Sequence, residues 1–255
     1  MLACLLGVLV ALAAAQTQPA PAVQAAPMQA PPVGYHFPNG QSYVYDVEWR
    51  LWTAGTAVLS IEPEGNEQHV RAAGNSVGTV GLLYHVGDRF DAWINSQTFC
   101  SRRITKHIEE GSRRVETTND FDYARKVAVL DQVNLRKGDR KHVEHPIPGC
   151  ATDVISAIYY TASLPLTTGS SYDFPLNDGG ETVAVKVTAE AREEVKTPAG
   201  TFRTVRAQPT ASAGVLKDRG KIWVWYTDDS QRIPVQMRAR MGWGTLTFRL
   251  VRVDK

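Results

Sequence analysis

Hydrophobic and polar residues alternate with a period of two along much of the chain. Between residues 43 and 52, the odd positions are apolar and the even positions carry most of the charges. The apolar set is Tyr43, Tyr45, Val47, Trp49 and Leu51, and the charged set is Asp46, Glu48 and Arg50. Alternation of this kind is typical of a half-buried strand. After a short break, residues 56–61 have the pattern of its hairpin partner.

Further segments show the same alternation and predict strands. They are residues 68–73, 88–94, 101–108, 113–121, 127–130, 182–190, 202–208, 221–226, 233–241 and 245–253. Turn-forming pairs such as Glu110-Gly111 and Asp178-Gly179 separate several of them. Strands spaced about 10 residues apart are typical of antiparallel sheets rather than of repeated βαβ units. The pattern predicts a mainly β fold, either a curved antiparallel sheet or a partly open β-barrel.

Residues 152–164 depart from this pattern and predict one principal α-helix. Several of their apolar side chains share one face at helical spacing: Val154, Ile155, Ile158, Tyr159 and Ala162. Thr152 is suited to cap the start of the helix, and Pro165 is suited to end it. We expect this helix to lie against one face of the sheet or to plug one end of the barrel.

The first 33 residues have a different composition. Residues 1–15 are apolar, uncharged and end in three alanines, which is the pattern of a cleaved secretory signal peptide. This run is shorter than the about 20 residues of a membrane-spanning helix. Residues 16–33 are uncharged and rich in Pro, Ala and Gln, which predicts a disordered tether. We expect a periplasmic or secreted protein with no transmembrane segment in the mature chain and one β-rich domain over residues 34–255.

The charge balance gives no sign of a nucleic-acid partner. Lys and Arg total 28 and Asp and Glu total 26, which gives a formal net charge of +2. Proteins that bind nucleic acids usually carry a strong basic excess on one face. The sequence identifies no protein partner either.

Two cysteines remain after removal of the signal peptide, Cys100 and Cys150. A pair in an exported chain favours a disulfide over a metal site, and two free buried thiols are the alternative. His142 and His145 form an H-x-x-H motif next to prolines, but no third ligand accompanies them. We interpret this segment as a solvated polar loop and expect no metal and no cofactor.

Residues 74–78, Gly-Asn-Ser-Val-Gly, match the G-x-S-x-G nucleophile elbow. This motif indicates a hydrolase only where it joins a strand to a helix in an α/β-hydrolase sheet. Because the surrounding segments predict antiparallel strands, we interpret it as a glycine-rich bend and assign no catalytic residue.

Basic residues gather around the turn at Gly111. They are Arg102, Arg103, Lys106, Arg113 and Arg114. Neighbouring strands would place them on a ribbon able to contact an anionic polysaccharide or phospholipid headgroups. However, Glu109, Glu110 and Glu116 are interleaved with them. This favours a salt-bridged hairpin at the edge of the sheet, where charge discourages aggregation.

Residues 223–237, WVWYTDDSQRIPVQM, combine aromatic, acidic and basic side chains. Alternation makes both faces of the strand at their start apolar: Ile222, Val224 and Tyr226 on one, Trp223 and Trp225 on the other. We expect core to cover one face of this strand and a helix, a second sheet or a ligand to cover the other.

Asp228 and Asp229 follow this strand in a segment with the composition of a turn. Adjacent residues of an extended chain point to different sides, which is unfavourable for a convergent acid–base pair. We therefore interpret the two carboxylates as turn residues.

Five blocks of sequence occur in order along the chain. They are AGTAVLSI (54–61), GLLYHVGDRFDAWI (81–94), TDVISAIYYTASLPL (152–166), TPAGTF (197–202) and WVWYTDDSQRIPVQM (223–237). Together they resemble the bacterial exported family known as domain of unknown function 3108, over nearly all of residues 43–253. The resemblance implies an exported, envelope-associated, mostly antiparallel β protein and supplies no catalytic residues.

Three functional hypotheses follow. The favoured one is non-catalytic binding of an amphipathic envelope ligand, a lipid or a glycan, because one strand has two apolar faces. Its candidate contacts are Trp52, Tyr84, Trp93, Trp223, Trp225 and Arg232. The second is an enzyme that acts on polysaccharide through carboxylates such as Asp88, Asp91, Asp228 or Asp229. The third is a structural partner that docks through an exposed strand edge.

Overall fold

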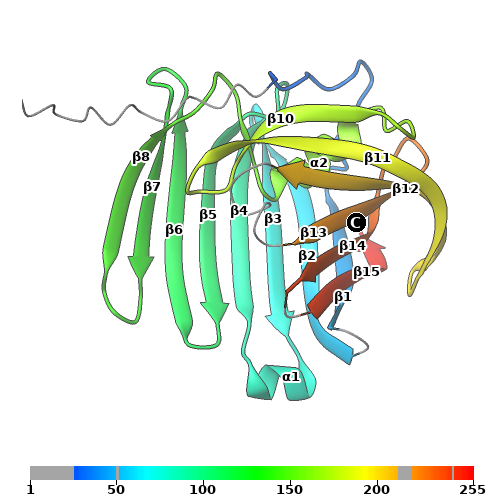
Figure 1. Ribbon diagram of the computed structural model, residues 1–255, viewed down its shortest axis with the longest axis horizontal. Coiled ribbons are helices and arrows are strands. Elements are labelled where there is room, and N and C mark those ends of the chain that lie inside the picture. The colour runs from blue at the N-terminus through cyan, green and yellow to red at the C-terminus, as the bar shows by residue number, and fades with distance from the viewer. Residues whose placement is uncertain (1–25, 50–51, 212–219, 243) are drawn as a thin grey trace, which may run out of the picture.

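The structure, a computed structural model, describes residues 26–49, 52–211, 220–242 and 244–255 (Figure 1). Within these residues, fifteen strands form one curled sheet that does not close on itself, and two short helices accompany it. The predicted mainly β fold with one principal helix is confirmed. The signal peptide predicted at residues 1–15 lies outside the described residues, as do Arg50 and Leu51.

The first eight strands form one arm of the sheet, in which each strand pairs antiparallel with the next in sequence. They are β1 (Gln41–Trp49), β2 (Trp52–Glu64), β3 (Glu67–Ser76), β4 (Gly87–Asn95), β5 (Ser101–Glu110), β6 (Arg113–Asp122), β7 (Val127–Asn134) and β8 (Arg140–Pro146). Helix α1 (Gly78–Leu83) connects β3 to β4. We call this part the N-terminal arm.

The remaining strands form the C-terminal arm. They are β9 (Thr152–Asp153), β10 (Ser171–Asn177), β11 (Thr182–Thr197), β12 (Gly200–Ala211), β13 (Lys221–Thr227), β14 (Pro234–Met241) and β15 (Gly244–Asp254). Their pairings are antiparallel except for β9 with β10. Because β1 pairs with β15, the two arms join in the middle of the sheet, with β8 at one edge and β9 at the other.

The edge of the N-terminal arm is not where the sequence predicts it. The hairpin β5–β6 lies between β4 and β7, so the basic cluster around Gly111 is inside the sheet. The predicted salt bridges are present, for example Arg113 with Glu110 at 2.8 Å. The edge is β8, which contains His142 and His145, where the sequence predicts a loop. This strand is mostly polar, which hides its alternation but suits an exposed edge.

The sequence also fails to predict strand β10, because Pro175 interrupts its apolar residues. A proline lacks the N–H that the interior of a sheet requires, so it argues against a strand at the sequence level. Here Pro175 lies beside β9, which is two residues long and pairs only with Leu176 and Asn177. The missing donor therefore costs little at this position.

Helix α2 (Ser156–Ser163) packs against strands of both arms. Its Tyr159 ring lies 6.4 Å from that of Tyr43 in β1, and its Tyr160 ring lies 4.8 Å from that of Phe174 in β10. The Tyr226 hydroxyl of β13 donates a hydrogen bond to a backbone carbonyl of the helix at 3.0 Å. Nearly every residue of α2 is buried, so it is an enclosed helix rather than an amphipathic surface helix.

The helix begins later than predicted, and a different residue caps it. Thr152 and Asp153 form β9, and the helix starts at Ser156. The Asp153 carboxylate is fully buried, and its Oδ1 accepts hydrogen bonds from the backbone N–H groups of Ile155 and Ser156, each at 3.0 Å. Its Oδ2 accepts a hydrogen bond from Ser101 Oγ at 2.6 Å. Asp153, not Thr152, therefore accepts hydrogen bonds from backbone N–H groups at the start of the helix, and it also links the helix to β5.

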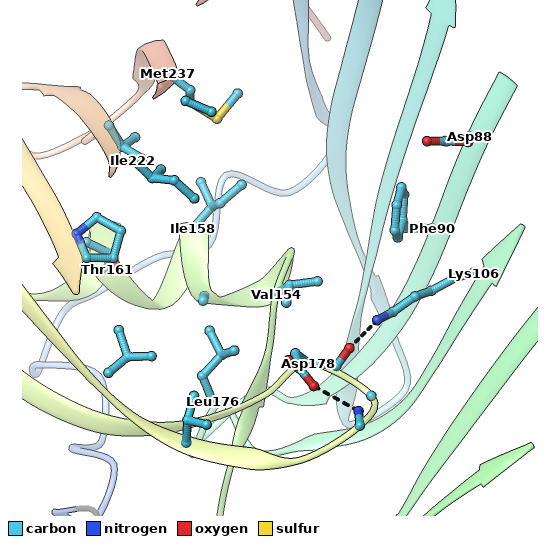
Figure 2. A pocket seen from close by; sticks show the side chains of 18 of the residues that line it. Asp88, Phe90, Lys106, Val154, Ile158, Thr161, Leu176, Asp178, Ile222 and Met237 are labelled. Carbon is cyan, nitrogen blue, oxygen red and sulfur yellow. Dashed lines mark hydrogen bonds between the residues drawn. The ribbon is translucent and has the colours of Figure 1, made fainter. Parts of the chain in front are cut away.

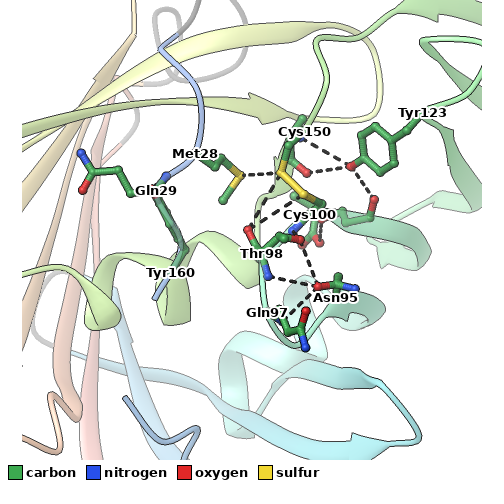
Figure 3. Close-up of a disulfide and its surroundings, with 12 residues drawn as sticks. Met28, Gln29, Asn95, Gln97, Thr98, Cys100, Tyr123, Cys150 and Tyr160 are labelled. Atoms are coloured by element: carbon green, nitrogen blue, oxygen red, sulfur yellow. Dashed lines mark hydrogen bonds between the residues drawn. A yellow bond between two sulfur atoms is a disulfide. The ribbon is translucent and has the colours of Figure 1, made fainter. Parts of the chain in front are cut away.

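The predicted disulfide between Cys100 and Cys150 is present (Figure 3). It joins the start of β5 to the segment before β9, and the two Cα atoms are 5.2 Å apart. Next to it, the Tyr123 hydroxyl lies 2.7 Å from the Ser101 carbonyl oxygen and 3.1 Å from that of Ala151. The disulfide and these contacts hold the segment that precedes β9 and α2 against the start of β5.

Part of the predicted tether contacts the fold. Residues 16–25 lie outside the described residues, but Met28 Sδ is 3.5 Å from Cys150 Sγ (Figure 3). The backbone N–H of Gln29 donates a hydrogen bond to the Tyr160 hydroxyl at 3.0 Å. Contact with the folded chain therefore begins before Gly34.

Reduction of the disulfide should destabilise the protein. The sequence separation of 50 residues corresponds to about 4 kcal/mol of lost stability in the chain-entropy model. Urea unfolding of the wild type and of the Cys100→Ser/Cys150→Ser variant measures this difference. Equal unfolding midpoints, or free thiols in unfolded, unreduced protein, would contradict the account.

Candidate functional site

A cavity of about 680 Å³ lies between the two arms of the sheet (Figure 2). Strands of the N-terminal arm form one wall, strands of the C-terminal arm form the other, and α2 lies beside them. The lining is mainly apolar and includes Phe90, Ile108, Leu130, Ile158, Val185, Val224 and Phe248. Its size falls in the range of about 300–1,000 Å³ that is usual for small-molecule sites.

The alternation of the strands decides which side chains reach the cavity. On β13, Ile222, Val224 and Tyr226 line it, so Trp223 and Trp225 face the opposite side of the sheet. On β4, Phe90 lines the cavity from the other wall. The inner face of β13 thus borders the cavity and contacts α2 through the Tyr226 hydroxyl.

The outer face of β13 is covered by polar side chains. The Trp225 indole N–H donates a hydrogen bond to Glu193 at 2.7 Å, and the Arg238 guanidinium lies over the indole ring, 5.4 Å from its centre. A second hollow of about 290 Å³ lies here, between Trp223, Trp225 and several charged residues. Because Trp225 is only 4% exposed, it is a supported part of the sheet rather than an open platform.

Charged residues line one part of the cavity and give it an amphipathic character. They include Asp88, Lys106, Glu110, Arg113, Lys141 and Asp178. Lys106 Nζ of β5 donates a hydrogen bond to the Asp178 carbonyl oxygen at 2.6 Å (Figure 2). Asp178 lies just after β10, so this bond joins the two arms across the cavity.

A second polar contact joins the arms near the first. The Asn119 side chain of β6 donates a hydrogen bond to Asn177 Oδ1 of β10 at 2.8 Å, and both residues are buried. The Asn177 amide lies 2.8 Å from His145 Nε2 of β8. The sheet is therefore open in its backbone pairing but bridged by side chains beside the cavity.

The Asp88 carboxyl lines the cavity, and its surroundings change its pKa. Burial raises the pKa of the Asp88 carboxyl above its usual value. The backbone N–H of Glu109 donates a hydrogen bond to it at 2.9 Å, which lowers its pKa in part. The carboxylate is thus held by a backbone donor in a partly desolvated position.

The six residues that the sequence predicts as ligand contacts do not form one site, and none lines the cavity, although Trp223 and Trp225 share the second hollow. Trp52 and Tyr84 are exposed at one end of the molecule. The Trp93 ring stacks on His69 at 4.5 Å, and its N–H donates a hydrogen bond to Glu64. The remaining three, Trp223, Trp225 and Arg232, lie on or after β13, away from the cavity lining.

The cavity-lining residues are the functional candidates that the sequence analysis missed. The signal for some of them was present, because alternation already groups Ile222 with Val224 and Tyr226. Both faces of that strand are apolar, so alternation alone does not say which face meets a cavity. That choice depends on how the distant N-terminal arm curls.

The candidate carboxylates of the enzyme hypothesis are also separated. Asp88 lines the cavity, whereas Asp91, three residues along the same strand, pairs with His69 at 2.8 Å. Asp228 and Asp229 lie between β13 and β14. Asp228 Oδ2 accepts a hydrogen bond from Arg192 at 2.7 Å, and this contact lowers the Asp228 pKa.

Asp229 shapes the connection between β13 and β14. Its Oδ1 accepts hydrogen bonds from the backbone N–H groups of Gln231 and Arg232, at 2.9 and 3.2 Å, and from the Thr227 hydroxyl at 2.8 Å. Side chains that bond to nearby backbone in this way are typical of turns. These bonds give the Asp229 carboxylate a structural role in the turn.

The G-x-S-x-G motif and the histidine motif show no catalytic or metal-binding geometry. Ser76 ends β3 in an antiparallel sheet, and its Oγ accepts a hydrogen bond from the Val86 N–H at 2.9 Å. His142 pairs with Asp131 at 2.7 Å, whereas His145 meets Asn177. Across the described ranges, no three potential metal-ligating side chains of His, Cys, Asp or Glu gather.

Replacing either turn carboxylate should lower stability modestly. Asp228→Ala loses the contacts with Arg192 and Arg232, and Asp229→Ala loses the turn bonds. We expect each to reduce the free energy of unfolding by about 1 kcal/mol in urea titrations. Glu194→Ala, at an exposed position of β11, is the control. A ligand-binding or catalytic activity lost in either variant at unchanged stability would make this turn part of a functional site.

Asp88→Asn should stabilise the protein at neutral pH. The folded-state pKa of Asp88 is raised, so the charged carboxylate opposes folding above that pKa, and the penalty disappears as the pH falls through it. Asparagine keeps an acceptor for the Glu109 N–H. The gain in melting temperature should therefore shrink in acid. Asp91→Asn, which loses the pair with His69, should show no such gain. A stability difference independent of pH would contradict the assignment.

No helix among residues 26–49, 52–211, 220–242 and 244–255 is both long and apolar enough to cross a membrane. No curated protein matches the chain. Among solved structures, a beta-barrel-like protein of the DUF1849 domain from Brucella abortus is similar to the chain, with 10% identity and a TM-score of 0.57. The match covers 84% of this chain and 96% of that one, and it supports the fold alone.

Two other solved structures match over similar lengths at lower TM-scores. One protein from Bacteroides fragilis is described as exported and as having a YmcC-like fold, with 9% identity, a TM-score of 0.37 and coverage of 87% and 98%. The other, from Parabacteroides distasonis, is described as a lipoprotein, with 11% identity, a TM-score of 0.34 and coverage of 86% and 97%. The family model described as Protein of unknown function (DUF3108) matches residues 44–251. Because this match spans most of the chain, the protein belongs to the DUF3108 family.

Proposed function

We propose that the protein binds an amphipathic ligand of the lipid class in the cavity between the two arms. The observation that carries the proposal is an apolar cavity of about 680 Å³ with charged residues along one part of its lining. Ligand sites typically combine a mainly apolar surface with a few polar groups that orient the ligand. A hydrocarbon chain matches the apolar walls, and a polar headgroup matches the charged part.

Close packing of protein interiors supports the same conclusion. Interiors have few voids larger than a water molecule. A space of this size, lined by side chains such as Val185, Val224 and Phe248, is therefore a site for another molecule rather than a packing irregularity. Water molecules would find few hydrogen-bond partners on an apolar lining.

A lipid fits better than a glycan on the features of this chain. The hydroxyl groups of a glycan would need hydrogen-bond partners that apolar walls lack. On the polar face of β13, the Trp225 ring is covered by Arg238 and almost fully buried. The apolar cavity lies on the other face of the same strand.

We further propose that residues 34–255 act as one exported domain in the periplasm or outside the cell. The Cys100–Cys150 disulfide supports this location, because structural disulfides persist mainly in oxidising compartments. The apolar residues 1–15 have the pattern of a secretory signal. An exported protein meets the lipids of the cell envelope.

Native mass spectrometry of protein purified from its own host tests this proposal. We expect a bound species in the mass range of lipids that organic extraction releases. Recovery of a protein partner alone would favour a structural role, and recovery of the bare chain after mild purification would contradict lipid binding.

A bulky side chain in the cavity should block binding. Ala239 lines the cavity from β14, whereas the neighbouring Arg240 is exposed on the opposite face. We expect Ala239→Trp to weaken binding of a fluorescent fatty acid by about tenfold or more, or about 1.4 kcal/mol. Arg240→Trp is the matched control and should bind the dye like the wild type. Melting temperatures check that both variants fold, and equal dye affinities in the two would contradict the site.

A further inference from the structure

Among the described residues, most of the large apolar side chains that are exposed lie at one end of the molecule. This end carries α1, the β5–β6 turn and the β7–β8 turn, which lie along the lower side of Figure 1. Leu82 and Leu83 of α1 are 88% and 83% exposed. Tyr84 and Leu135 are exposed beside them, and α1 has no buried residue at all. A six-residue helix that buries nothing contributes little to the core, so its apolar tip needs another explanation.

The three segments form one continuous surface. The Gly111 N–H of the β5–β6 turn donates a hydrogen bond to the His85 carbonyl oxygen at 2.7 Å. A Cβ at Gly111 would lie 2.7 Å from the Tyr84 ring, so the ring rests directly on this turn. On the other side, the Leu135 N–H donates a hydrogen bond to the Arg114 carbonyl oxygen at 2.9 Å. We call this surface, residues 78–85, 110–114 and 134–141, the rim.

Part of the cavity lining reaches solvent at the rim, and we call this place the mouth of the cavity. Glu110 and Arg113 of the β5–β6 turn and Lys141 of β8 all belong to the rim and also line the cavity. Arg113 and Lys141 are exposed, so the lining continues into the surface at this point. The apolar tips and the mouth of the cavity therefore share one end of the molecule.

Positive charge accompanies the apolar residues. Residues 134–141, the basic turn, carry four cations against one carboxylate, and all of these side chains are exposed: Arg136, Lys137, Asp139, Arg140 and Lys141. Lys137, Arg140 and Lys141 form no ion pair with any residue that the structure describes. Of the acidic residues in the neighbouring β5–β6 hairpin, Glu110 pairs with Arg113 at 2.8 Å and Glu109 with Arg114 at 3.5 Å.

We propose that the rim docks on the surface of a membrane that contains anionic lipids. Isolated apolar side chains at the tips of short segments, beside unpaired cations, match the boundary between acyl chains and anionic headgroups. In this geometry Leu82 and Leu83 enter the interface, the basic turn contacts the headgroups, and the mouth of the cavity faces the bilayer. This inference goes beyond ligand binding, because docking through the rim requires no ligand in the cavity.

Flotation of the full-length mature protein with lipid vesicles tests the proposal. We expect binding to vesicles of phosphatidylglycerol and phosphatidylcholine, weak binding to vesicles of phosphatidylcholine alone, and loss of the difference in high salt. Equal binding to both vesicles, or binding to neither, would overturn the proposal. Self-association through the rim without vesicle binding, measured by analytical ultracentrifugation, would overturn it as well.

Two variants separate the charged and apolar contributions. Each cation near an anionic surface strengthens binding several-fold, so Lys137→Glu/Arg140→Glu should weaken vesicle affinity by about tenfold or more. Lys196→Glu/Arg203→Glu makes the same change in charge on the β11–β12 hairpin, outside the rim, and should bind nearly like the wild type. Equal losses in the two variants would show a general effect of net charge and refute docking through the rim.

The apolar variant is Leu82→Ser/Leu83→Ser, with Val33→Ser as a control at an exposed apolar position outside the rim. We expect the double variant to lose about tenfold in vesicle affinity. Its melting temperature should stay close to that of the wild type, because neither leucine is buried. Its fatty-acid binding should also be retained, which distinguishes failed docking from failure of the cavity. Unchanged vesicle affinity would refute the proposed insertion.

Discussion

The curled sheet has an apolar inner face that is wider than the enclosed helix α2 can cover. At 1.5 Å per residue, the eight residues of α2 span about 12 Å. Strands from both arms turn apolar side chains toward the same interior, and α2 packs against only part of it. The uncovered part is the cavity. Its existence thus follows from the mismatch between a long sheet and a short helix, and the proposed function depends on that mismatch.

Besides the backbone pairing of β1 with β15, side-chain contacts hold the two arms around this space. A fully buried carboxylate, Asp153, caps α2 and binds Ser101 of β5, and the disulfide next to it fixes the same junction. Beyond it, Lys106 meets the carbonyl of Asp178. A closed barrel would not need such contacts to join its edges, because every strand would pair on both sides. The open form leaves a mouth whose borders are polar side chains and turns, and these same turns carry the exposed apolar tips.

Alternation along the chain predicts most strands and the side of each strand on which its residues lie. Alternation is less informative for segments in which polar residues or a single proline hide the pattern, and it does not identify the residue that caps a helix. Polar β8 and proline-containing β10 have weak alternation, and Asp153, whose Oδ1 caps α2, is also bound through its Oδ2 by Ser101, far away in sequence. The cavity was unpredictable for a related reason. Both faces of β13 are apolar, and only the curl of the distant arm determines that Val224, rather than Trp225, faces the cavity.

On the proposed function, a lipid chain enters the space between the arms. Paramagnetic broadening of methyl resonances by a fatty acid with a nitroxide on its chain measures this directly. The account predicts strong broadening at Ile158 and Val224, which line the cavity, and little at Val58, which is partly exposed on β2 and is not part of the lining. Broadening at Val58 or near Trp223, with Ile158 and Val224 unaffected, would place the lipid on the outer surface and contradict the account.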